Sequence, residues 1–205
     1  MIKRFVFASS QHAALASKLR RVPAALRPLR AVVCSALQAD TDGVSIEWFA
    51  NVDALQRYRS WEREHDLQPS AAEVIAQEVV LRGAEWLAQR WKTLDPKFKH
   101  MALARRAPGL TAAEFSERWR NRPGQIGGGQ NQSLAIPEAA KGQAYCQNHP
   151  LPDSQSPYDA INEVYFDQLE DMRPRIEFFR DHPVARLDAD LVSEPRFLIV
   201  REDPI

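Results

Sequence analysis

Polar side chains that can move a proton or hold an oxyanion are concentrated in two predicted strands, at residues 143–149 and 160–166. Side chains alternate between the two faces of a strand. Histidine exchanges a proton near neutral pH, a poorly hydrated carboxyl group can have a raised pKa, and tyrosine or glutamine can stabilise an oxyanion. We expect one face to carry all of these groups into a shared interior pocket: Tyr145, Gln147, His149, Glu163 and Tyr165.

A third histidine and two tryptophans complete the candidate site. His100 shares a strand face with Ala102 and Ala104, and two alanines leave room for a ligand if that face points inward. Trp119 and Trp48 are expected to line or support the pocket wall. His149 or His100 would be the general acid or base, and Glu163 its partner or replacement. These groups suit proton abstraction beside a carbonyl, cyclisation or elimination.

Each of these residues also has a structural interpretation. His149 can be an exposed residue at a strand end, directly before Pro150. Glu163 and Tyr165 can be packing residues, and His100 can be part of a core. A buried polar cluster is either a satisfied network or a site, so the sequence leaves both interpretations open.

The elements that must position these residues occur twice. The segment from Ile46 to Phe49 resembles the segment from Glu163 to Phe166, and the offset between Trp48 and Tyr165 is 117 residues. A similar offset of 112 residues separates the two cysteines, Cys34 and Cys146. A repeat of this length indicates two halves of one architecture in tandem.

Both halves have the predicted order βαββαβ, the ferredoxin-like unit. Residues 1–82 form the first repeat, 83–96 a linker that packs as a helix, and 97–205 the second repeat. In the second repeat, Thr111 and Glu114 form a capping box at a helix start. The expected strands are 2–8, 30–38, 44–50, 73–82, 98–105, 143–149, 160–166 and 196–201, and the expected helices are 11–21, 54–65, 111–122 and 169–180.

The second repeat resembles a known family over about residues 96–202. The run from Arg106 to Phe115, with Trp119 after it, looks like the opening of an EthD domain, and residues 145–149 and 163–171 are similar to its later strands. The resemblance implies a dimeric α+β barrel, closed here within one chain by two ferredoxin-like halves, and makes small-molecule chemistry plausible. The family's turn histidine corresponds to Pro123, so no role that rests on that histidine transfers.

The first repeat lacks the polar face. Val33, Ser35 and Leu37 match Tyr145, Gln147 and His149, and Ile46 matches Glu163. We therefore expect an asymmetric pseudo-dimer with one working pocket in its C-terminal half, with a cavity beside His149 and a filled interior beside Ile46.

Composition excludes several classes of function. The 205 residues are 44% hydrophobic and 26% charged, with zero formal net charge and a pI near 7.0, which gives no reason to expect nucleic acid or an anionic membrane as partner. No apolar run approaches a membrane span, no signal peptide is evident, and the two cysteines suit core sites in a reducing cytoplasm. Metal-binding motifs are absent, and a homodimer through helix or edge surfaces is compatible with the pattern.

The sequence favours a cofactor-independent lyase, isomerase or cyclase that acts on a small apolar or aromatic intermediate. One alternative is a haem-binding barrel, which would need a proximal histidine from His149, His100 or His182. The other is a module that binds a ligand without converting it.

Overall fold

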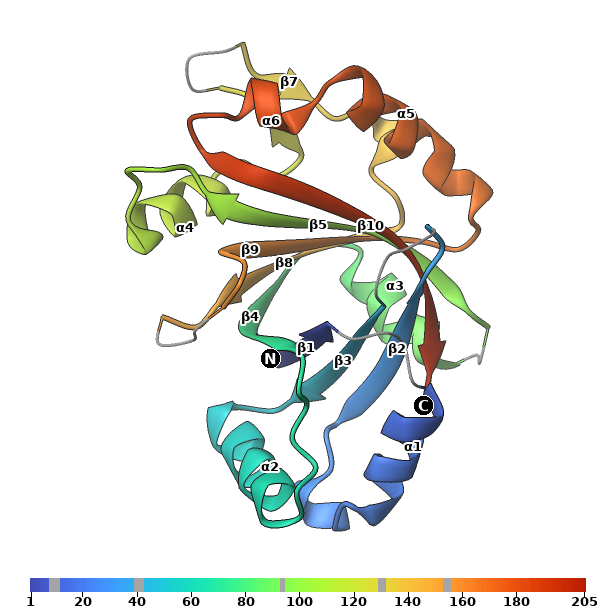
Figure 1. The fold of residues 1–205 in the computed structure, drawn as a ribbon. Coiled ribbons are helices and arrows are strands. Elements are labelled where there is room, and N and C mark those ends of the chain that lie inside the picture. The colour runs from blue at the N-terminus through green and yellow to red at the C-terminus, as the bar shows by residue number, and fades with distance from the viewer. Residues whose placement is uncertain (8–11, 39–42, 93–94, 129–131, 153–155) are drawn as a thin grey trace.

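The structure is a computed structural model that describes residues 1–7, 12–38, 43–92, 95–128, 132–152 and 156–205. In this part of the chain, eight strands close into one barrel in the order β1-β3-β2-β10-β5-β9-β8-β4 (Figure 1). The strands of the barrel are β1 (Ile2–Phe7), β2 (Arg30–Ala36), β3 (Val44–Phe49), β4 (Ala72–Arg82), β5 (Lys97–Arg106), β8 (Ala144–Pro150), β9 (Ala160–Phe166) and β10 (Val192–Pro204).

Two four-stranded sheets of the same topology make the barrel. The N-terminal sheet has the order β4-β1-β3-β2, and the C-terminal sheet has the corresponding order β10-β5-β9-β8. Antiparallel pairing of β10 with β2 and of β4 with β8 joins them. The predicted fold class, two ferredoxin-like repeats closed as a single-chain dimeric α+β barrel, is confirmed. Closure also removes the exposed sheet edges.

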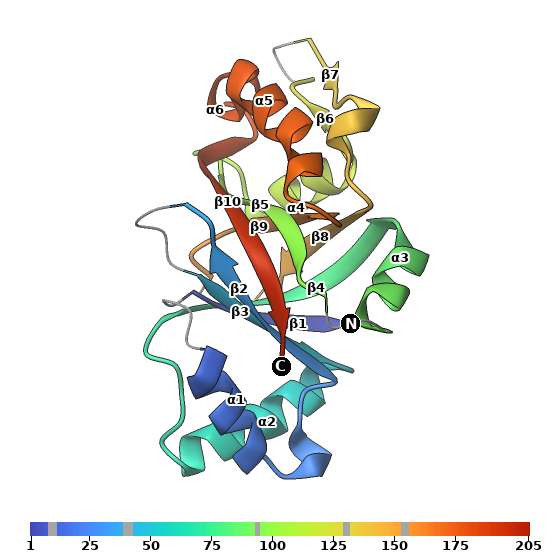
Figure 2. The same ribbon diagram turned by 90° about the vertical axis from the view of Figure 1, so that its right-hand side faces the viewer.

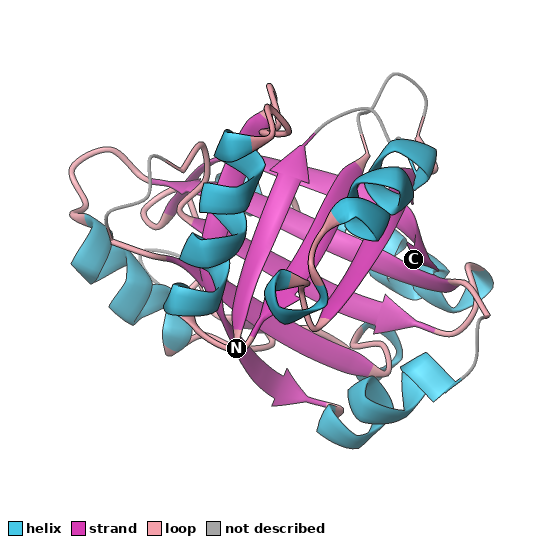
Figure 3. Ribbon diagram, turned by 90° about the horizontal axis from the view of Figure 1, so that it is seen from below, coloured by secondary structure: helices cyan, strands magenta, loops and turns pink. Residues whose placement is uncertain are grey.

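Helices cover the outer face of each sheet on opposite sides of the barrel (Figures 1 and 2). The N-terminal side carries α1 (His12–Arg21) and α2 (Val52–Glu64), which lie over the strands in Figure 3. The C-terminal side carries α4 (Ala112–Arg120), α5 (Arg173–Asp181) and α6 (Val184–Leu187). Between the halves, α3 (Ala84–Gln89) begins after Gly83, whose positive φ of 71° suits glycine.

Local sequence explains the principal helices. In α2, the Asn51 side chain accepts a hydrogen bond from the Ala54 N–H at 2.9 Å, and Leu55, Tyr58 and Trp61 form the buried stripe. At the start of α4, both hydrogen bonds of the predicted Thr111–Glu114 capping box are present.

The C-terminal repeat has additions that the pattern did not predict. A small two-stranded sheet, β6 (Gln125–Ile126) and β7 (Leu134–Ala135), follows α4. The strand β10 is longer than expected, because it continues past an irregularity between Ser193 and Arg196 to pair with both β5 and β2. These additions and α6 build a wall over one end of the C-terminal sheet.

The barrel interior is a single core to which both halves contribute. Its apolar part includes Phe5, Val32 and Ile46 from the first half and Met101 and Leu198 from the second, all almost fully buried. The space beside Ile46 is filled, as expected. Cys34 and Cys146 are buried and unpaired, which fits their prediction as core residues. None of the described helices is long and apolar enough to cross a bilayer.

Candidate functional site

The register of β8 and β9 separates the predicted site residues onto two faces. Tyr145 pairs with Val164, and Cys146 pairs with Glu163, so Glu163 lies on the face opposite to Tyr145. The prediction that the five polar side chains share an inner face is therefore wrong. A shift of one residue moves every side chain to the other face. The error arose because both faces of this sheet are covered, so that small apolar Cys146 suits either face.

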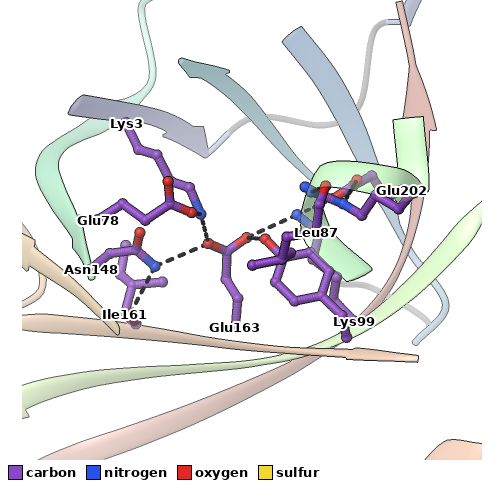
Figure 4. A network of polar contacts seen from close by, with 10 residues as sticks. Lys3, Glu78, Leu87, Lys99, Asn148, Ile161, Glu163 and Glu202 are labelled. Atoms are coloured by element: carbon purple, nitrogen blue, oxygen red, sulfur yellow. Dashed lines mark hydrogen bonds and ion pairs between the residues drawn. The ribbon is translucent and has the colours of Figure 1, made fainter. Parts of the chain in front are cut away.

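Glu163, Tyr165 and Trp48 lie inside the barrel. The Glu163 carboxylate ion-pairs with Lys3 and with Lys99, the latter at 2.8 Å (Figure 4). It also accepts a hydrogen bond from Tyr165 at 3.0 Å. Burial alone would raise the pKa of Glu163, but the two lysines outweigh it and hold that pKa below its usual value. The lysine Nζ atoms lie 5.1 and 5.8 Å from the Trp48 ring. Both oxygens of Glu163 are therefore engaged by cations and hydrogen-bond donors, which disfavours Glu163 as the group that takes a proton from a substrate.

The network extends to further buried charges that join the two halves. Lys3 also pairs with Glu78 at 2.8 Å, and Glu202 pairs with Lys99 and, at 3.4 Å, with Arg90. Asn148 donates a hydrogen bond to Glu163 at 3.0 Å. The structural alternative therefore describes Glu163 better than the catalytic one.

The opposite face of the C-terminal sheet lies under α4 and α5 and borders a cavity of about 250 Å³, which we call the outer cavity. Ala102 and Ala104 leave room in the sheet, as their small size predicted, although their face points away from the barrel interior. The lining also includes Arg82, Trp119, Arg122, Lys141, Tyr145, Gln147, Asn162, Val164, Arg175, Phe179, Asp188 and Phe197. This volume is slightly below the usual range of ligand pockets and suits a small molecule.

Three of the sequence-predicted residues line this cavity. Gln147 donates hydrogen bonds of 3.2 Å to the Tyr145 hydroxyl and to the Trp119 carbonyl. Trp119 packs against Phe115 at 5.5 Å between ring centroids. Burial raises the pKa of Tyr145 to about 12, so its hydroxyl remains protonated and able to donate at neutral pH.

Several polar atoms of the lining lack partners. Among the described residues, the buried Oε1 of Gln147, Oδ1 of Asn162 and Nε1 of Trp119 make no hydrogen bond. Buried polar atoms are nearly always satisfied, and each exception requires an explanation. These two acceptors and one donor, together with the buried Nη1 of Arg82, which also lacks a partner in this part of the chain, are what a polar ligand would satisfy.

The two candidate histidines lie on the outer face but outside the lining. His100 accepts a hydrogen bond at Nδ1 from Arg175 Nε at 3.1 Å and stacks on Phe179 and Phe197. Burial and then the Arg175 charge lower the pKa of His100 well below its usual value, so it is neutral. His149 lies beside α4, with Nδ1 3.4 Å from the Ser116 hydroxyl, and burial followed by Arg120 lowers its pKa.

Asp188 and Arg175 were not among the sequence-predicted residues. Asp188 is the only carboxylate among the described lining residues; its Oδ1 accepts hydrogen bonds from the Gly127 N–H at 2.8 Å and from Arg122 at 3.3 Å. Burial raises its pKa. Arg175 is 4% exposed. No histidine belongs to the described lining, and the described residues contain no cluster of three metal-ligating side chains.

Comparisons with known proteins support the fold alone. The chain is similar to the crystal structure of a presumed monooxygenase from Fusobacterium nucleatum subsp. nucleatum, with a TM-score of 0.54 and 8% identity over 99% of this chain and 93% of that one. A presumed monooxygenase from Lactobacillus acidophilus aligns with a TM-score of 0.49 and 9% identity over 100% of this chain and 97% of that one. No family model and no curated protein matches the chain, so the EthD resemblance is not confirmed.

Proposed function

We propose that this chain is an enzyme that removes a proton from a small, largely apolar molecule bound in the outer cavity. The observation that supports the proposal is the set of unpartnered buried atoms on Gln147, Asn162 and Trp119 in the wall of one cavity. Buried polar atoms in a packed layer usually have partners, so a concentration of unpartnered atoms in one lining supports a ligand site.

Two lining residues are proposed to carry the chemistry. Asp188 is the general base, because burial raises its pKa and its Oδ2 has no hydrogen-bond partner among the described residues. Tyr145, kept neutral by burial, donates its hydroxyl to the oxygen on which negative charge develops. Lyase, isomerase and cyclase reactions can all begin with this step. His149, His100 and Glu163 have no direct role in it.

A haem protein is less well supported than proton transfer. Haem needs an axial ligand, most often histidine, beside a space for the macrocycle. His100 accepts a hydrogen bond from Arg175, and His182 is placed at the end of α5 with Nδ1 2.9 Å from the Phe178 carbonyl. Neither residue, nor His149, borders the outer cavity in the described part of the chain.

Solvent exchange tests the proposal without knowledge of the product. We expect the protein to speed deuterium incorporation beside the carbonyl of at least one member of a panel of small cyclic and aromatic ketones, with and without a carboxylate group, in D₂O, measured by NMR. Asp188→Asn should slow this exchange about 10²–10⁴-fold, and Tyr145→Phe about 10²–10³-fold. Oxygen uptake by the same mixtures under air should be measured in parallel. It tests for the monooxygenase reaction that the name of the Fusobacterium protein suggests.

The matched control is Asp159→Asn, because Asp159 pairs with Arg106 and lies outside the described lining. Its exchange rate should equal that of the wild type. Asp188 must be ionised to act as the base, and its pKa is raised. We therefore expect kcat/KM to fall as the pH is lowered, with a midpoint above the pKa of an ordinary aspartate. Ligands that bind but never exchange would favour the binding module instead.

The remaining proposals concern organisation and location. We retain 1–82 and 97–205 as the two structural units and 83–96 as the segment that joins them. A cytoplasmic location agrees with the two unpaired buried cysteines. A homodimer would have to use helix surfaces, because the barrel closes within one chain.

A further inference from the structure

Arg175 is a buried cation whose recorded partners are neutral. Its Nε donates to His100 at 3.1 Å, its Nη1 donates to the Ala140 carbonyl at 3.0 Å, and its guanidinium lies 4.7 Å from the Phe179 ring centroid. Within the described residues, no carboxylate forms an ion pair with it. Burying a charge without a counter-ion is costly, so an arginine in this position indicates that a counter-ion comes from elsewhere.

The first repeat shows the same position with its charges balanced. The offset of 117 residues that relates Trp48 to Tyr165 also relates Tyr58 to Arg175. In the first repeat, the Tyr58 hydroxyl donates to Glu47 at 2.6 Å, and Arg4 pairs with Glu47 at 3.0 Å and with Glu62 at 2.9 Å. Lys18 contacts the same two carboxylates.

The second repeat has no carboxylate at the positions equivalent to Glu47 and Glu62. At the same offset, Val164 replaces Glu47 and Phe179 replaces Glu62, and both of these apolar residues border the outer cavity. The ladders agree with this equivalence, since β1 pairs Arg4 with Glu47 and β5 pairs His100 with Val164. The positions that hold carboxylates in one half therefore hold apolar side chains of the cavity wall in the other, beside a cation.

The other charges around the outer cavity are compensated within the protein. Arg122 pairs with Asp188 at 3.3 Å, and Arg82 and Lys141 pair with Glu138 at 3.0 and 2.8 Å. His100 and Tyr145 are neutral at pH 7, for the reasons given above. Among the described lining residues, Arg175 is thus a cation without a charged partner.

We propose that the molecule bound in the outer cavity carries an anionic oxygen, as a carboxylate, phenolate or enolate, which pairs with Arg175 in the place that Glu47 occupies in the first repeat. Its apolar ring lies against Val164, Phe179 and Phe197. The inference rests on the proposed function only in assigning the substrate to this cavity. It narrows the substrate class to small aromatic or alicyclic acids, phenols and enols.

Benzoate and benzamide, which have similar shape and differ in charge, test the inference by calorimetric titration at pH 7. We expect the wild type to bind benzoate at least 10-fold more tightly than benzamide. A hydrogen bond to a charged group contributes about 1.5–3 kcal/mol, so Arg175→Gln should weaken benzoate binding about 10- to 100-fold and leave benzamide nearly unchanged. Arg118→Gln is the control, because Arg118 pairs with Asp190 outside the described lining.

If Arg175→Gln does not fold, Arg175→Lys still tests the role of the positive charge. Because it keeps that charge, this variant should retain a preference for benzoate over benzamide. In the wild type, equal affinities for the two probes, or binding of neither at millimolar concentration, would overturn the inference even if deuterium exchange occurs. Benzoate selectivity that depends on Arg175, without exchange on any ketone, would support the inference and contradict the enzymatic proposal. The two claims can therefore fail separately.

Discussion

Glu163→Gln is expected to destabilise the protein by about 3–5 kcal/mol, because it leaves buried lysines without their shared carboxylate. Lys3, Lys99 and Glu163 have side chains with no solvent exposure, and Glu163 contacts both lysines. Lys3 belongs to the first repeat and Lys99 to the second, so the loss weakens the contact between the halves. Urea unfolding followed by fluorescence measures the change.

The matched control is Glu138→Gln, which removes an exposed carboxylate that pairs with Arg82 and Lys141. Exposed ion pairs contribute little, so its unfolding midpoint should stay close to that of the wild type. An equally small effect of Glu163→Gln would mean that the interior network does not hold the barrel together.

The stability of the wild type should also depend on pH through Glu163. Its pKa is lower in the folded protein than in the unfolded chain, so its contribution is complete above the unfolded value near 4.5 and is lost as pH falls through the range below it. Unfolding free energies measured at a series of acidic pH values should fall less steeply for Glu163→Gln than for the wild type.

Val164→Glu is expected to fill the outer cavity with an internal counter-ion and to abolish benzoate binding. Glu47, its equivalent in the first repeat, lies 2.6 Å from the Tyr58 hydroxyl, and Tyr58 is the equivalent of Arg175. A carboxylate at 164 should therefore reach the guanidinium. We expect the loss of benzoate affinity to exceed 100-fold, since the new carboxylate removes both the space and the charge.

Val164→Gln separates charge from volume, because glutamine has nearly the same size as glutamate. If Arg175 lacks a counter-ion in the wild type, the glutamate variant should be more stable than the glutamine variant by about 1.5–3 kcal/mol, the contribution of a charged hydrogen bond. Thermal unfolding of the two variants at pH 7 measures this difference. A glutamate variant that is the less stable of the two would contradict the assignment of Arg175 as a cation that needs a counter-ion.

The fold could be predicted because its signals are local and repeated. The strands, the Thr111 capping box and the second copy of the Ile46–Phe49 pattern each specify an element, and two βαββαβ units have few ways to cover their open faces. The β6–β7 sheet and α6 were missed because two- and four-residue elements carry almost no periodicity.

The site could be predicted only in part. Alternation shows which side chains share a face of a strand, but not whether that face points into the barrel or toward the helices. Tyr145, Gln147 and Trp119 line the outer cavity, whereas Glu163 and Tyr165 lie inside the barrel. In a sheet covered on both sides, polar residues occur on either face, and only the register between β8 and β9 decides the matter.

Arg175 was missed although the sequence held a signal for it. The repeat offset aligns it with Tyr58, and aligns Glu47 and Glu62 with Val164 and Phe179. A comparison of charge between the two halves, residue by residue, would have revealed a cation without carboxylates. Asp188 had no such signal, since it lies at the end of α6 and contacts Gly127 directly after β6, and the sequence pattern predicted neither of these short elements.

Crystals soaked with 4-bromobenzoate give the most direct test of the assignment of the site, through the anomalous signal of bromine. We predict one bromine peak in the outer cavity, between the C-terminal sheet and α5, with the carboxylate within hydrogen-bond distance of Arg175. A peak inside the barrel beside Glu163, or a carboxylate turned away from Arg175, would contradict the account.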